Sequence, residues 1–187
     1  MSQRTTIKRH PERTVPDHHQ VEEILARGVV AHLGFAEGAQ PVVIPLTYGY
    51  DPAAPDRILL HGSHASRTLK HLATGAPVCV TVTTVQGLVY SRTAPDHSMN
   101  YESVIIFGTA RPIKDVDQKA KLFREMIERY HPGRTPGRDY QPPTREDLMS
   151  TAVVEVQIEE MSAKVRTGGP RGRLDSDPEA PGTCGVI

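Results

Sequence analysis

Short runs of β-branched and alternating apolar residues dominate the chain. Gly, Pro or Asp residues separate most of these runs, which is typical of strands joined by tight connections. Seven strands are predicted, over residues 29–35, 41–50, 57–62, 77–85, 87–93, 101–113 and 151–166. Because helices do not alternate regularly with these runs, the pattern favours a mainly antiparallel sheet.

Four segments show helical spacing of apolar residues instead: 18–27, 66–72, 115–130 and 144–149. The first should end at Gly28, and Thr144 with Asp147 three residues on is typical of a helix start. Asp115 can cap the longest helix, which we expect to lie across an opening of the sheet. Its predicted apolar face consists of Val116, Ala120, Phe123, Met126, Ile127 and Tyr130.

So many short strands would leave exposed edges unless the sheet closes on itself. The predicted fold is therefore mainly β with peripheral helices: a split barrel of six to seven mostly antiparallel strands, with one helix between the third and fourth. Residues 17–166 form this domain, residues 1–16 a flexible basic arm, and residues 167–187 a Gly/Pro-rich tail that is extended or disordered on its own.

Composition excludes several classes of protein. The 187 residues include 22 basic and 22 acidic side chains, so the formal net charge is zero, and no general affinity for nucleic acid or membranes is expected. No run approaches the roughly 20 apolar residues of a membrane span. Only Cys79 and Cys184 are present, and no histidine spacing favours a metal. We expect a cytoplasmic protein without a bound metal ion.

The start of the helix over residues 66–72 carries an unusual pair of cations. Arg67 and Lys70 lie in the first turn, where the helix dipole disfavours positive charge by about 0.3–1 kcal/mol unless an anion is seated there. Ser63 or Ser66 can serve as N-cap. The pattern is consistent with a phosphate site after the preceding strand. The alternative is a solvated helix with ordinary surface charges.

Four blocks, in this order, resemble a known family: PVVIPLTYGY, RILLHGSHASRTLKHL with PVCVTVT, GLVYSR, and HSMNYESVIIFGTARPI. They are similar to the flavin-binding split barrels related to pyridoxamine 5′-phosphate oxidase, and within them to the nitroimidazole-resistance-like proteins. The resemblance covers roughly residues 15–166. It implies a homodimer with one FMN in each of two clefts at the subunit interface.

The resemblance also implies which residues contact FMN. One subunit would contribute backbone and side chains around the flavin ring and its phosphate, from Ile44, Pro45, Leu46, Tyr48, Leu60, His61, Gly62, Ser66, Arg67 and Lys70. The other subunit would contribute Ser98, Asn100, Tyr101 and Ser103. His61 is the candidate catalytic residue, because a neutral imidazole beside a flavin can donate a hydrogen bond or pass a proton. A structural role for His61, as for His64 and His71, is the alternative.

The implied function is that of an FMN-dependent oxidoreductase, nitroreductase-like, acting on an unidentified small molecule. The chain lacks the C-terminal pattern with which pyridoxamine 5′-phosphate oxidases bind their substrate, so that reaction is not expected. One alternative is a non-catalytic flavin-binding or sensor module. Another is a split barrel that uses haem or a deazaflavin coenzyme. Arg92 would either lie near the flavin or pair with Glu102.

Overall fold

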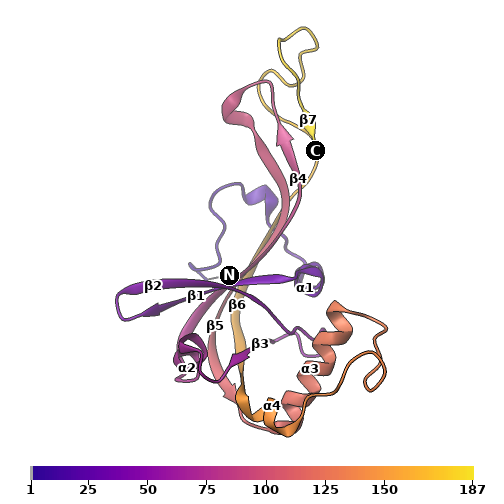
Figure 1. Ribbon diagram of the computed structural model, residues 1–187. Helices are drawn as coiled ribbons and strands as arrows, with labels where there is room; N and C mark the ends of the chain where they lie inside the picture. The colour runs from indigo at the N-terminus through magenta and orange to yellow at the C-terminus, as the bar shows by residue number, and fades with distance from the viewer. Residues whose placement is uncertain (1) are drawn as a thin grey trace.

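The computed structural model describes residues 2–187 and has a strongly curled antiparallel sheet at its centre (Figure 1). Six strands follow one another in the order β2–β1–β4–β5–β6–β3, and a short seventh strand pairs with β4. The strands are β1 (Val30–Glu37), β2 (Gln40–Thr47), β3 (Arg57–Ser63), β4 (Pro77–Tyr90), β5 (Ser98–Ile113), β6 (Thr151–Arg166) and β7 (Gly185–Val186). The prediction of a mainly β, split-barrel fold is confirmed.

One face of the sheet forms the core. Alternate residues along each strand point inward, as the period of two requires, and Leu33, Val80 and Ile106 are among the fully buried ones. Two helices pack their apolar side chains into this core. They are α1 (His18–Arg27), which begins at an Asp17 cap, and α2 (Arg67–Leu72), which lies between β3 and β4 as predicted.

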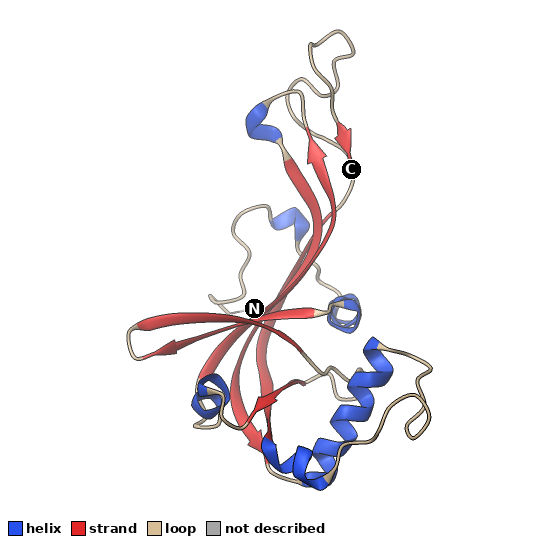
Figure 2. Ribbon diagram, viewed as in Figure 1, coloured by secondary structure: helices blue, strands red, loops and turns tan. Residues whose placement is uncertain are grey.

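Strands β4 and β5 pair along nearly their full length and extend well beyond the barrel (Figure 2). The prediction of two strands over 77–85 and 87–93 was wrong, because β4 runs without a break from Pro77 to Tyr90. The register shifts between Val85 and Gly87, so the chain absorbs one extra residue as a bulge instead of turning.

The long helix α3 (Val116–Tyr130) lies across the open end of the curled sheet, near β3 and α4 (Arg145–Ser150) (Figure 1). Its predicted apolar face was only partly right, since the buried residues are Lys119, Leu122 and Met126. Lys119 is buried because its ammonium group donates to the carbonyl oxygens of Leu148 and Thr151, 3.0 and 2.7 Å away. Helix α3 therefore turns Lys119 toward the carboxyl end of α4, where its ammonium group bonds carbonyl oxygens that the helix leaves without a partner.

The two terminal segments lie against the domain. In the N-terminal segment, a single turn η1 (Pro11–Arg13) precedes Val15, whose amide donates to the Ala163 carbonyl on β6 at 3.0 Å. In the C-terminal segment, β7 pairs with the end of β4, near the turn η2 (Ala94–Asp96). Within residues 2–187, no helix is both long and apolar enough to cross a membrane.

Gly108 offers a test of the β5–β6 pairing. A Cβ atom added there would lie 2.0 Å from the Gln157 carbonyl oxygen, at the point where the register between the two strands shifts. Because the obstacle is backbone, Gly108→Ala should lower the free energy of unfolding by about 2–4 kcal/mol in urea titrations. Gly169→Ala is the matched control, because nothing lies within 4 Å of its added Cβ. Equal stability of the two variants would contradict this register.

Candidate functional site

Helix α2 has the features that the sequence predicted. Ser66, not Ser63, is its N-cap, with the side-chain oxygen accepting from the Leu69 amide at 3.4 Å. Arg67 is largely exposed and lies 3.5 Å from the Glu37 carboxylate at the end of β1. Among residues 2–187, no ion pair holds the exposed ammonium group of Lys70. The helix thus presents two cations to solvent, of which only Arg67 has an acidic neighbour.

Strand β2 supplies the predicted backbone contacts at an open edge. In the described chain β2 pairs with β1 alone, so its outer side carries backbone N–H and C=O groups without a strand partner. None of its residues is fully buried, and Ile44, Pro45 and Leu46 lie in its second half. A planar ligand with alternating donors and acceptors can pair with such an edge.

Tyr48 lies just beyond this strand and is fully buried. Its hydroxyl donates to the Leu25 carbonyl oxygen at 2.5 Å, and burial raises the pKa of Tyr48 to about 12. The Arg129 guanidinium lies over its ring, 4.3 Å from the centroid. In the single chain Tyr48 therefore fastens α1 and α3 to the barrel, with its hydroxyl already engaged.

His61 on β3 is half-buried, with its ring edge-on to Phe123 of α3 at 5.5 Å between centroids. Its Nδ1 atom is buried and has no hydrogen-bond partner among the described residues. Desolvation by this burial lowers the pKa of His61 from its ordinary value of 6.5. The imidazole is therefore neutral near pH 7 and has one nitrogen free to bond a ligand. Leu60 beside it is a core residue, and Gly62 is half-buried.

Helix α2 brings the β3 residues close to the β1–β2 hairpin. Besides the Arg67–Glu37 contact, the His71 ring stacks on Phe35 with centroids 5.0 Å apart. Helix α2 therefore lies beside β1, whereas the His61 ring of β3 faces Phe123 of α3. The residues from Ser98 to Ser103 lie apart from these, on the β4–β5 extension (Figure 1). Their contact with a cofactor from a partner subunit stays a prediction.

The predicted residues of β5 also divide between the two faces of the sheet. Tyr101 and Ser103 are half-buried on the outer face, whereas Asn100 is buried on the opposite face. The Asn100 amide nitrogen donates to the Gly168 carbonyl at 3.1 Å, and its oxygen accepts from Arg166. Asn100 therefore has structural partners within its own chain.

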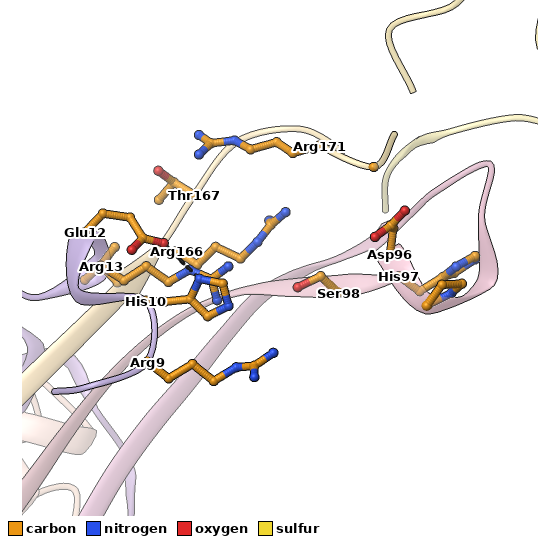
Figure 3. Close-up of a pocket in the computed structure, with 13 residues that line it drawn as sticks. Arg9, His10, Glu12, Arg13, Asp96, His97, Ser98, Arg166, Thr167 and Arg171 are labelled. Carbon is orange, nitrogen blue, oxygen red and sulfur yellow. Dashed lines mark hydrogen bonds and ion pairs between the residues drawn. The ribbon is translucent and has the colours of Figure 1, made fainter. Parts of the chain in front are cut away.

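A cavity with a volume of about 760 Å³ lies beside Ser98 (Figure 3). It lies between η1, the start of β5 and the segment after β6. Four arginines line it: Arg9, Arg13, Arg166 and Arg171. These arginines were not among the predicted site residues. They come from segments that lie far apart in the sequence and share no motif.

A second cavity, of about 440 Å³, lies between α2, the β5–β6 end and α4. Its walls are mostly apolar, including Leu69, Ile113 and Val153. The chemistry at its edge is supplied by His64, Met149, Lys70, Lys114 and Lys119. An imidazole, a thioether and cations around apolar walls are groups that can hold a haem and its carboxylates.

The outer face of the sheet carries exposed apolar side chains along the β4–β5 hairpin. Val85, Leu88, Met99 and Ile105 are between 38% and 55% exposed, and Val43 on β2 is 64% exposed. Isolated exposed apolar residues are ordinary, but a series along one face is typical of a surface that meets another protein.

Arg92 does not pair with Glu102, and its predicted position near the flavin stays a prediction. Its side chain donates to the carbonyl oxygens of Ala180 and Gly182, and its backbone amide donates to Asp175 at 2.9 Å. Glu102 pairs instead with Arg27, at 3.0 Å. Arg92 therefore fastens the C-terminal segment to the hairpin.

The curled antiparallel sheet with a helix between β3 and β4 defines a split-barrel protein. A family profile described as pyridoxamine 5′-phosphate oxidase matches residues 17–165. The chain belongs to this family, and the family resemblance drawn from the sequence is confirmed. Among curated proteins no match was found.

Solved structures similar to this chain include a flavocytochrome and a protein described as binding FAD and haem. The flavocytochrome Anf3 from Azotobacter vinelandii is 33% identical, over 100% of this chain and 84% of that one, with a TM-score of 0.86. An FAD and haem binding protein from Mycobacterium smegmatis is 29% identical over 94% and 83%, with a TM-score of 0.82. A 5-nitroimidazole antibiotic resistance protein from Bacteroides thetaiotaomicron shares the fold at 22% identity, 81% and 86% coverage and a TM-score of 0.65.

The depressed pKa of His61 predicts a pH dependence of stability. In the unfolded state His61 is protonated as pH falls below about 6.5. In the folded state it is protonated only at lower pH, because its pKa is lowered. The stability that neutral His61 contributes is therefore present above that pH and is lost as pH falls toward the folded pKa. Urea unfolding at about pH 7.5 and 5.5 should show a smaller pH effect for His61→Gln than for the unsubstituted protein. The same difference in both proteins would contradict the buried, neutral imidazole.

Proposed function

We propose that this protein is a flavin-binding electron-transfer protein that acts as a homodimer and also binds haem, as a flavocytochrome does. The observation that carries this proposal is the 33% identity to a flavocytochrome along the whole chain. The 29% identity to an FAD and haem binding protein supports it independently. Similarity to the nitroimidazole-resistance protein is weaker, at 22%, and speaks for the fold alone.

The flavin would lie against the open edge of β2, with Ile44, Pro45 and Leu46 offering backbone groups to its ring. Ser66, Arg67 and Lys70 would hold a phosphate, since the two cations face solvent and a phosphate would bring both of them an anionic partner. His61, neutral and with a free buried nitrogen, would donate to or accept from the ring. When bound, the flavin supplies the redox chemistry, and these residues supply its position.

The sequence favoured FMN and a nitroreductase-like reaction. The more similar structures favour the alternative, a split barrel with haem, and one of them is named for FAD. We therefore propose that the flavin is a dinucleotide, with electron transfer between flavin and haem as the activity.

The cavity beside α2 is our candidate for the haem. His64 and Met149 offer nitrogen and sulfur ligands of the kind that bind haem iron, and Met149 is 57% exposed at the cavity edge. Lys114 would pair with a propionate. Dimerisation would cover the exposed apolar side chains of the β4–β5 hairpin and would place Tyr101 and Ser103 at the partner's flavin.

An absorbance spectrum of the purified protein, recorded before and after loading with FAD, FMN or haem and desalting, tests this function directly. We expect a retained flavin spectrum and a retained Soret band. Exchanging His64 for Ala should abolish the Soret band and leave flavin binding intact. His131→Ala, at the exposed end of α3, is the matched control and should retain both.

A colourless protein that retains neither group would overturn the proposal. A flavin band without a Soret band would leave a flavoprotein and remove haem from the assignment. If both histidine variants keep the Soret band, the haem does not bind in the α2 cavity.

The phosphate assignment has its own test. Each charge-assisted hydrogen bond contributes about 1.5–3 kcal/mol, less where the group is exposed, so Arg67→Gln with Lys70→Gln should weaken flavin binding by about 10- to 100-fold. Fluorescence titration with FMN, which has a single phosphate, measures the change. The double variant Arg124→Gln with Arg145→Gln removes the same charge from exposed positions elsewhere and should bind normally. Unchanged affinity in the α2 variant would refute the assignment.

A further inference from the structure

The arginine-lined cavity beside Ser98 carries more positive charge than its own residues balance. Four arginines line it, whereas the acidic side chains that line it are Glu12 and Asp96. Glu12 is already engaged by His10 at 3.0 Å and lies 3.8 Å from Arg13, and Asp96 accepts from the Thr93 hydroxyl. Within residues 2–187, no ion pair neutralises Arg9, Arg166 or Arg171. A group of this kind attracts an anion.

Hydrogen bonds hold the side chain of Arg166 and the backbone of Arg9 in place. Arg166 is 8% exposed, and its guanidinium donates to the Asn100 side chain and to the Gly168 and Gly169 carbonyls. The Lys164 ammonium donates to the Arg9 carbonyl at 2.8 Å, which fixes the N-terminal segment along β6. In Figure 3, Arg9 and Arg171 lie on opposite sides of Arg166, around the open space. The Arg166 guanidinium therefore needs little reordering to receive a ligand.

The electrostatics of Arg166 point the same way. Burial lowers the pKa of this guanidinium, and the positive charges of Arg13 and Arg171 lower it further. The group remains charged, so the free protein carries unrelieved repulsion among its cations. A bound anion would relieve that repulsion.

We propose that this cavity binds the diphosphate of a dinucleotide, a step that rests on the proposed function. Planar guanidinium groups pair with phosphate oxygens through two parallel hydrogen bonds, and several arginines on different sides match two linked phosphates better than one. The hydroxyls of Ser98 and Thr167 add neutral donors at the same cavity. The volume of about 760 Å³ also accommodates a ligand larger than a single phosphate.

Two dinucleotides present this chemistry. One is the flavin cofactor itself, whose diphosphate would then lie between helix α2 of one subunit and this cavity of the other subunit in the dimer. The other is a reduced nicotinamide dinucleotide that brings electrons. The cavity lies at Ser98, itself a predicted flavin contact on the same face of β5 as Asn100, which is compatible with either source.

The first measurement is calorimetric titration of the purified protein with inorganic pyrophosphate. The variant is Arg9→Gln with Arg171→Gln, because both side chains are exposed and neither is needed for the core. Arg124→Gln with Arg145→Gln is the control for net charge. We expect binding that weakens at least tenfold in the cavity variant and stays unchanged in the control. No binding to the unsubstituted protein, or equal weakening in both variants, would overturn the proposal.

The second measurement distinguishes the two sources. Dissociation constants for FAD, FMN and reduced nicotinamide dinucleotide are compared between the same proteins. A preference for FAD over FMN that disappears in the cavity variant assigns the cavity to the flavin. Weaker nicotinamide dinucleotide binding, with the FAD preference intact, assigns it to the electron donor. If neither changes, the diphosphate site is refuted.

These outcomes separate this site from the proposed function. Pyrophosphate bound through Arg9 and Arg171 in a protein that retains no flavin would refute the flavoprotein assignment and keep the anion site. Flavin retention without pyrophosphate binding would do the reverse.

Discussion

The continuous pairing of β5 with β4 on one side and β6 on the other is the interaction on which the rest of the structure depends. Val104 and Ile106 of β5 are fully buried on the core face, while Ile105 between them is exposed on the outer face. Because side chains alternate, one strand both builds the barrel and presents an apolar outer surface. Its first residues then extend beyond the barrel and border the arginine-lined cavity.

Within residues 2–187, the candidate sites share a physical feature: each has a buried polar or charged group that lacks either a hydrogen-bond partner or a counter-charge. His61 has a buried nitrogen without a partner, and Arg166 lies among cations with too few carboxylates. Burying such groups costs free energy unless a ligand pairs with them. A protein that binds anionic redox cofactors would compensate that cost on binding, so these features and the flavocytochrome similarity favour the same class of function.

Much of the fold was readable because local signals agreed with each other. The caps at Asp115 and Thr144 were predicted, and Ser66 was one of the two residues predicted for the cap of α2; each accepts a backbone amide. Prediction failed where a long-range contact decided the outcome. Gly87 looked like a break between strands, yet pairing with β5 carries β4 past it as a bulge. Lys119 was not part of the predicted apolar face of α3, yet it is buried because its ammonium group donates to the carbonyl of Leu148, 29 residues later.

The sequence by itself determined the order of most strands and helices, the family, and the pair of cations in the first turn of α2, because each depends on neighbouring residues. Only the tertiary structure decided which distant residues meet. The curl of the sheet and the paths of both terminal segments bring Arg9, Arg13, Arg166 and Arg171 around one cavity, although more than 150 residues separate the first pair from the second. Basic residues at two chain ends carry no periodic signal, so their shared field exists only once the chain has folded.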